Sequence, residues 1–155
     1  MYKRILVPME NKDHQALAFA HAGRLARDVQ ATVILAWLVT VVASEEYFMR
    51  RIQVEPGSSG ARRKEEGERF LDQAAEAMRS AGVETLTKVV VSTVPPEQAI
   101  LDLAREEGAD LIVMATLPQS AVGRFLLSSV GEKIRHRSSI PILFVNARAE
   151  DQGKG

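Results

Sequence analysis

A short turn between two predicted elements is the first place in this sequence where chemistry is expected. Residues 110–116 form a brief apolar run rich in β-branched side chains, and an amphipathic segment predicted to be a helix follows from Ser120 to His136. The turn between them is predicted to contain Pro118. Backbone N–H groups and the dipole of a following helix can hold an anion at such a turn. The question posed by this stretch is therefore whether the turn binds a phosphate.

The same stretch, read to Val145, resembles the C-terminal half of universal stress protein domains. Nucleotide-binding members of that family carry Gly-x-x-Gly, nine residues, and then Gly followed by Ser or Thr. Laid on this sequence without a gap, the pattern places its glycines at Ala115, Pro118 and Ser128 and its hydroxyl at Ser129. The flanking segments are similar too: VMAT at 113–116, RFLLSSVGEK at 124–133 and PILFV at 141–145.

All three glycines of the pattern are missing. Pro118 has no N–H and fixes φ, while Ala115 and Ser128 each add a side chain where a phosphate must approach the backbone. We therefore expect no ATP binding in the family manner. The resemblance also implies an Asp after the first strand that contacts the nucleotide. Glu10 stands there, either as a longer version of that ligand or as a solvated turn carboxylate.

Strands and helices are predicted to alternate along the chain. We predict strands at 3–9, 32–40, 85–93, 110–116 and 140–145, and helices at about 13–29, 62–81, 96–108 and 120–136. This alternation indicates an α/β fold with a three-layer, open, parallel five-stranded sheet. The resemblance, which covers nearly the whole chain, implies strand order 3-2-1-4-5 and a Rossmann-like adenine-nucleotide-binding architecture. It implies one domain at 1–147, followed by a polar tail at 148–155 that we expect to be disordered.

That strand order places a topological switch point between the first and fourth strands. Ligands of such sheets bind outside the carboxyl ends of the strands at this point. We expect the cleft to be ringed by 9–10, 36–37 and 115–129. The candidate nucleotide-binding positions are Met9, Glu10, Ala36, Ala115, Pro118, Ser128 and Ser129.

Composition excludes several classes of protein. The 155 residues include 20 basic and 20 acidic side chains and no cysteine, so thiol chemistry is excluded and no global charge attracts nucleic acid or an anionic membrane. The apolar run that begins near the N-terminus is too short for a signal peptide, and the longest such run, 32–43, is far below the ~20 residues that span a bilayer. We expect a cytoplasmic protein without membrane insertion.

Other candidate chemistry is sparse. His14, His21 and His136 have no second ligand type at a metal-binding spacing, so no metal is expected. No catalytic triad, HExxH or Walker motif is present, and an enzyme is the weaker class. Residues 44–60 contain a Pro-Gly-Ser-Ser-Gly run and are predicted to be a mobile loop.

The resemblance and the missing glycines together imply a stress-response or regulatory domain that acts through dimerisation and partner binding without a cofactor. The alternatives are a domain that holds ATP or another adenine nucleotide through altered contacts, and a slow ATP hydrolase. The run from Ile140 to Val145 would be an edge strand without blunting charges, so we expect it to pair with a second copy. The predicted dimer interface comprises Pro141, Ile142, Leu143, Phe144 and Val145.

Overall fold

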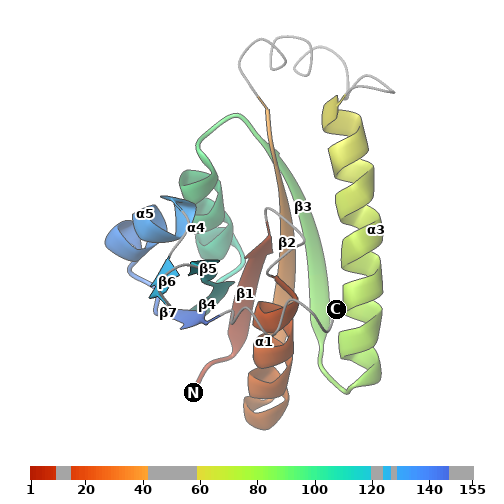
Figure 1. Cartoon of the computed structure of the whole chain (residues 1–155). Coiled ribbons are helices and arrows are strands. Elements are labelled where there is room, and N and C mark those ends of the chain that lie inside the picture. Colours follow the sequence, from red (N-terminus) through yellow and green to blue (C-terminus); the bar gives the residue numbers. More distant parts are fainter. Residues whose placement is uncertain (10–14, 42–58, 120–123, 127–128, 147–155) are drawn as a thin grey trace.

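The computed structural model describes residues 1–9, 15–41, 59–119, 124–126 and 129–146. A parallel five-stranded sheet forms the middle layer (Figure 1). Its strands are β1 (Arg4–Met9), β2 (Thr32–Thr40), β3 (Thr85–Ser92), β4 (Leu111–Ala115) and β7 (Ile142–Val145). The helices are α1 (Gln15–Val29), α3 (Ser59–Ser80), α4 (Pro96–Glu106) and α5 (Ser129–Arg137). The order in space is β3-β2-β1-β4-β7, which confirms the order 3-2-1-4-5.

Helices cover both faces of this sheet. α1 and α3 lie on one face, and α4 and α5 lie on the other (Figure 1). Side chains alternate along each strand, as the two-residue period of a strand requires. In β2, Val33 and Leu35 join the α1–α3 core while Ile34 and Ala36 join the α4–α5 core. The central strands are therefore apolar on both sides, which explains their unbroken apolar runs.

Helix ends follow the expected chemistry. Pro96 opens α4, where the missing N–H costs nothing, as predicted. Gly82 and Gly108 follow α3 and α4 with φ of +84° and +64°, values at which a side chain would be strained. α3 begins at Ser59, three residues before the predicted start, so part of the expected Ser-Ser-Gly loop lies in its first turn.

The predicted helix over 120–136 was wrong in its first half. Leu117–Gln119 forms a short strand, β5, that pairs antiparallel with β6 (Arg124–Leu126), and the helix begins only at Ser129. The apolar residues of 122–127 match either a helix or a strand, and cross-strand pairing of Leu117 with Leu126 decides for the strand. Serine at 129 favours a helix start over a helix interior.

Within the described part of the chain, no helix is both long enough and apolar enough to span a membrane. The tail at 148–155 and most of the loop predicted at 44–60 lie outside the described residues.

Candidate functional site

Strands β1 and β4, which are neighbours in the sheet, separate at their carboxyl ends. β1 pairs with β2 as far as Met9 opposite Trp37, but its described pairing with β4 is confined to Ile5–Leu111 and Leu6–Ile112. Beyond those pairs, the ends of β1 and β4 have no ladder between them among the described residues. This divergence lies at the switch point of the strand order, where sheets of this kind bind ligands.

Met9 is the last residue of β1 and Ala36 lies opposite Pro8 in the middle of β2, and the side chains of Met9 and Ala36 lie on opposite faces of the sheet. Met9 belongs to the core under α1 and α3, whereas Ala36 belongs to the core under α4 and α5. Both are fully buried. Neither side chain is therefore available to a ligand at the sheet edge, and only the backbone at these positions could contribute there.

The end of β4 is held toward β7 and away from β1. Ala115, which is half-buried, pairs with Val145. The N–H of Thr116 donates to the carbonyl of Val145 at 2.8 Å, and the buried Thr116 hydroxyl donates to the same oxygen at 3.3 Å. These bonds keep the chain extended one residue beyond β4 and fix the point from which the next segment departs.

That next segment is the β5–β6 hairpin rather than a plain turn. Pro118 lies in β5 opposite Phe125. A proline is tolerated here because a two-stranded hairpin leaves half of its backbone groups unpaired with the other strand. Because proline has no backbone N–H, position 118 cannot donate a hydrogen bond to an anion.

Ser129 is the first residue of α5 and is exposed. The positive end of the helix dipole lies at this terminus, a favourable anion-binding feature that the sequence pattern retains. Ser128 and Glu10, the other candidates nearby, lie outside the described residues.

α5 is fixed by its inner face and by polar contacts with α4. Val130 and Ile134 are buried against the sheet. Lys133 lies 3.7 Å from the buried carboxylate of Glu97 on α4. These contacts position the helix whose first turn borders the candidate cleft.

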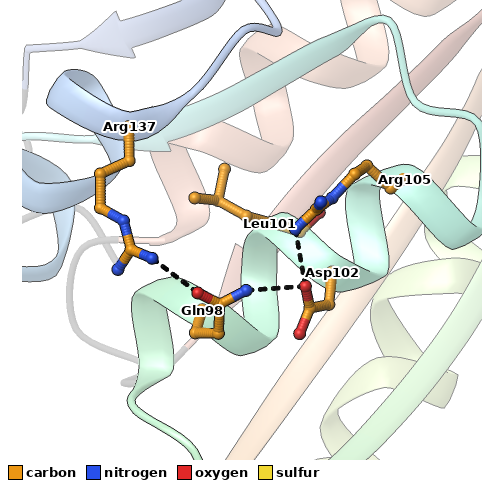
Figure 2. Close-up of polar contacts among 5 residues, drawn as sticks. All are labelled: Gln98, Leu101, Asp102, Arg105 and Arg137. Atoms are coloured by element: carbon orange, nitrogen blue, oxygen red, sulfur yellow. Dashed lines mark hydrogen bonds and ion pairs between the residues drawn. The ribbon is translucent and has the colours of Figure 1, made fainter.

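The far end of α5 joins a chain of side-chain contacts along α4 (Figure 2). Arg137 donates to Gln98 at 2.6 Å, Gln98 donates to Asp102 at 2.8 Å, and Arg105 donates to the same Asp102 oxygen at 2.8 Å. Asp102 thus receives one charged donor from its own helix, and Gln98 links it to α5. The arrangement fixes the two helices relative to each other.

The predicted interface strand, β7, is at the edge of the sheet. Val145 is buried and Ile142 and Phe144 are half-buried, whereas Pro141, just before the strand, and Leu143 are exposed. Leu143 is 41% exposed, one of three large apolar side chains so exposed among the described residues. Among the residues that the structure describes, no strand pairs with the outer edge of β7, and this edge also carries an exposed apolar side chain.

Histidines do not gather with other ligands. His21 is exposed on α1, and His136 on α5 lies 3.6 Å from Glu132. In the ranges that the structure covers, no three His, Cys, Asp or Glu side chains are placed to hold a metal ion, and His14 lies outside those ranges.

Comparison with known proteins identifies the family. The family model described as "Universal stress protein family" matches residues 1–146. This chain belongs to the universal stress protein family. "Universal stress protein YxiE" of Bacillus subtilis is 29% identical to it over 156 residues, covering 94% of this chain and 99% of the relative.

Solved universal stress proteins have the same fold. A structure from Burkholderia pseudomallei is 27% identical with a TM-score of 0.70, covering 94% of this chain and 97% of the other. Another, described as a universal stress protein in complex with cAMP, is 24% identical with a TM-score of 0.63, covering 94% and 97%.

Two positioning residues were missed from the sequence. The Asp110 carboxylate accepts the backbone N–H groups of Lys3 at 2.8 Å and Arg4 at 3.0 Å, which holds the starts of β1 and β4 together. Gly67 on α3 lies directly against the indole of Trp37. An aspartate just before an apolar strand signals a capping role only weakly, and a single glycine within a helical pattern gives no indication of which side chain it meets.

Proposed function

We propose that this universal stress protein is a regulatory or stress-response domain that forms a homodimer and acts by binding a protein partner. It does not hold ATP in the family manner. The observation that carries the proposal is Pro118 within β5, at a position where the nucleotide-binding pattern has glycine. A phosphate loop needs successive N–H groups and an unobstructed backbone, and this position supplies no N–H.

The other candidate nucleotide-binding positions also disfavour ATP binding. Ala115 carries a methyl group and is held in the β4–β7 ladder, and the third glycine position is Ser128. The buried side chains of Met9 and Ala36 offer a nucleotide no polar contact. What favours an anion is the start of α5 at Ser129, whose contribution in solvent is small, about 0.3–1 kcal/mol.

Dimerisation is supported by the edge strand. β7 has a free edge among the described residues, carries no charged side chain, and exposes Leu143. Two copies of such a strand can pair about a two-fold axis and so satisfy each other's backbone groups. Members of the family commonly form dimers.

Calorimetric titration with Mg-ATP tests the absence of ATP binding. We expect no binding at micromolar affinity from the unmodified protein. Glycine at Ala115, Pro118 and Ser128 together should restore measurable affinity if the loop is the cause. Sub-micromolar binding by the unmodified chain would overturn the proposal. A triple variant that stays folded but gains nothing would shift the cause to Glu10 or to residues 44–60.

A second candidate is an adenine-nucleotide-binding domain with altered contacts, with slow ATP hydrolysis as a variant of it. It is favoured by the exposed Ser129 at the start of α5 and by the cAMP complex of a solved relative, which at 24% identity shares the fold alone. Titration with ATP and cAMP, followed by a phosphate-release assay, separates these possibilities from each other. We further propose a cytoplasmic location, which cell fractionation would test.

A further inference from the structure

A hollow lies between α1 and α3, the two helices that cover one face of the sheet. Its volume is about 310 Å³, and small-molecule sites occupy roughly 300–1,000 Å³. Met78 and Val83, both buried, form part of its lining. Because the lining on α3 comes from its last two turns, the hollow lies toward the amino ends of the strands. The candidate nucleotide cleft is at the opposite, carboxyl ends.

Small side chains create this hollow. Half of the lining residues are small: Ala20 and Gly23 on α1, Ala74 and Ala77 on α3, and Ala81 just after α3. Their short side chains leave space between the two helices unfilled. A methyl group added at Gly23 would still lie 3.8 Å from the terminal methyl of Met78, an ordinary van der Waals contact. The apolar walls are accessible to solvent, and covering them would release water from apolar surface.

Two arginines border the apolar walls. Arg24 and Arg27 lie three residues apart on one side of α1, and both are exposed. Neither has a hydrogen bond or ion pair with any other residue that the structure describes. The lining contains no acidic side chain. The hollow is thus an apolar trough with two positive charges at one rim and no acidic side chain in its described lining.

We propose that this hollow binds an anionic amphiphile, an alkyl chain with a carboxylate head. The chain would lie between the small residues of the two helices, and the carboxylate would pair with Arg24 and Arg27. Guanidinium groups bind carboxylates through two parallel hydrogen bonds, so two arginines at one rim favour an acid over an alcohol or a cation. The site is independent of the nucleotide cleft and of the edge strand β7.

Calorimetry with three ten-carbon probes below their micellar concentrations tests the inference: decanoate, 1-decanol and decyltrimethylammonium. Decanoate should bind best, about tenfold or more tighter than the cation. Shortening the acid should weaken binding about three- to fourfold for each methylene lost. Labelling the methionine methyl groups with ¹³C should show the Met78 signal shifting with decanoate, while Met114, in the core under α4 and α5, stays unchanged.

Three variants locate the site. Gly23→Leu should fill the hollow and abolish binding of all three probes. Arg24→Gln with Arg27→Gln should remove the preference for decanoate while 1-decanol still binds. Arg69→Gln, an exposed arginine on α3 outside the lining, is the matched control and should change nothing.

Each other outcome overturns the inference. Equal affinity for decanoate and decyltrimethylammonium would show that the arginines do not select an anion. Unchanged decanoate binding by a folded Gly23→Leu variant, or by the double arginine variant, would place the ligand elsewhere. If Gly23→Leu instead changed the oligomeric state measured by light scattering, the hollow would be an interface with a second copy.

Discussion

Gly67 and Gly23 form a matched pair of helical glycines that differ in what lies beside them. A methyl group added at Gly67 would lie 2.6 Å from Nε1 of Trp37 and closer still to Cδ1 and Cγ, whereas one at Gly23 meets nothing nearer than 3.8 Å. Trp37 is 5% exposed on a central strand and packs on Phe70, with ring centroids 5.9 Å apart, so it has little freedom to move. Alanine should therefore have opposite effects at the two positions.

The magnitudes follow from two terms. Alanine in a helix interior is favoured over glycine by about 1 kcal/mol at both positions. At Gly67 this gain is opposed by overpacking, typically about 1–3 kcal/mol, and contact with three ring atoms argues for the upper part of that range. We expect Gly67→Ala to lower the free energy of unfolding by about 1–2 kcal/mol and Gly23→Ala to raise it by up to about 1 kcal/mol.

Urea unfolding followed by the fluorescence of Trp37 measures both changes, since it is the only tryptophan in the chain. For a domain of this size, each kcal/mol corresponds to about 2–4 °C in Tm. Gly67→Ala should also alter the native emission spectrum, and Gly23→Ala should not. If Gly67→Ala were as stable as Gly23→Ala, with the same emission, the close approach of α3 to Trp37 would be refuted.

Three further predictions concern the edge strand, the sheet end and the loop. Leu143→Lys should lower the oligomeric state seen by light scattering at tens of micromolar, whereas Val94→Lys, an equally exposed apolar side chain after β3, should not; a monomeric unmodified protein would contradict the proposed dimer. Asp110→Ala should cost about 1–3 kcal/mol of unfolding free energy, because the N–H groups of Lys3 and Arg4 lose a charged acceptor; an unchanged urea midpoint would contradict this. Restoring glycine at the three loop positions should raise affinity for Mg-ATP in calorimetry, and an affinity equal to that of the unmodified chain would remove the loop as the cause.

Much of the fold could be predicted from the sequence. The apolar runs of β1 and β2 are long and β-branched, and Pro96 and Gly108 bracket α4 with residues whose backbone preferences suit a helix start and a helix end. These signals are local, so each element could be located without its neighbours. The strand order came from the resemblance to universal stress proteins, because periodicity alone does not rank the arrangements of five buried strands.

The candidate site was less predictable. Met9 ends β1, but Ala36 lies in the middle of β2, opposite Pro8, and the two buried side chains point to opposite faces of the sheet. Residues 117–119 and 124–126 were predicted as a turn and part of a helix, yet they form two strands that pair antiparallel. A short apolar run fits the period of a helix as well as that of a strand. Only the cross-strand pairing, with Leu126 opposite Leu117, distinguishes the two structures.

The sequence by itself therefore determined where the five strands of the sheet and the helices α1, α3 and α4 lie, and which glycines the phosphate loop lacks. Tertiary structure alone decided where Gly67 meets Trp37, how Asp110 joins β1 to β4, and that small residues on α1 and α3 face each other across a hollow. The physical reason is the distance along the chain over which each kind of interaction acts. Backbone preference and periodicity act over a few neighbouring residues, whereas these contacts join segments from about 30 to more than 100 residues apart, brought together only when the sheet and helices pack.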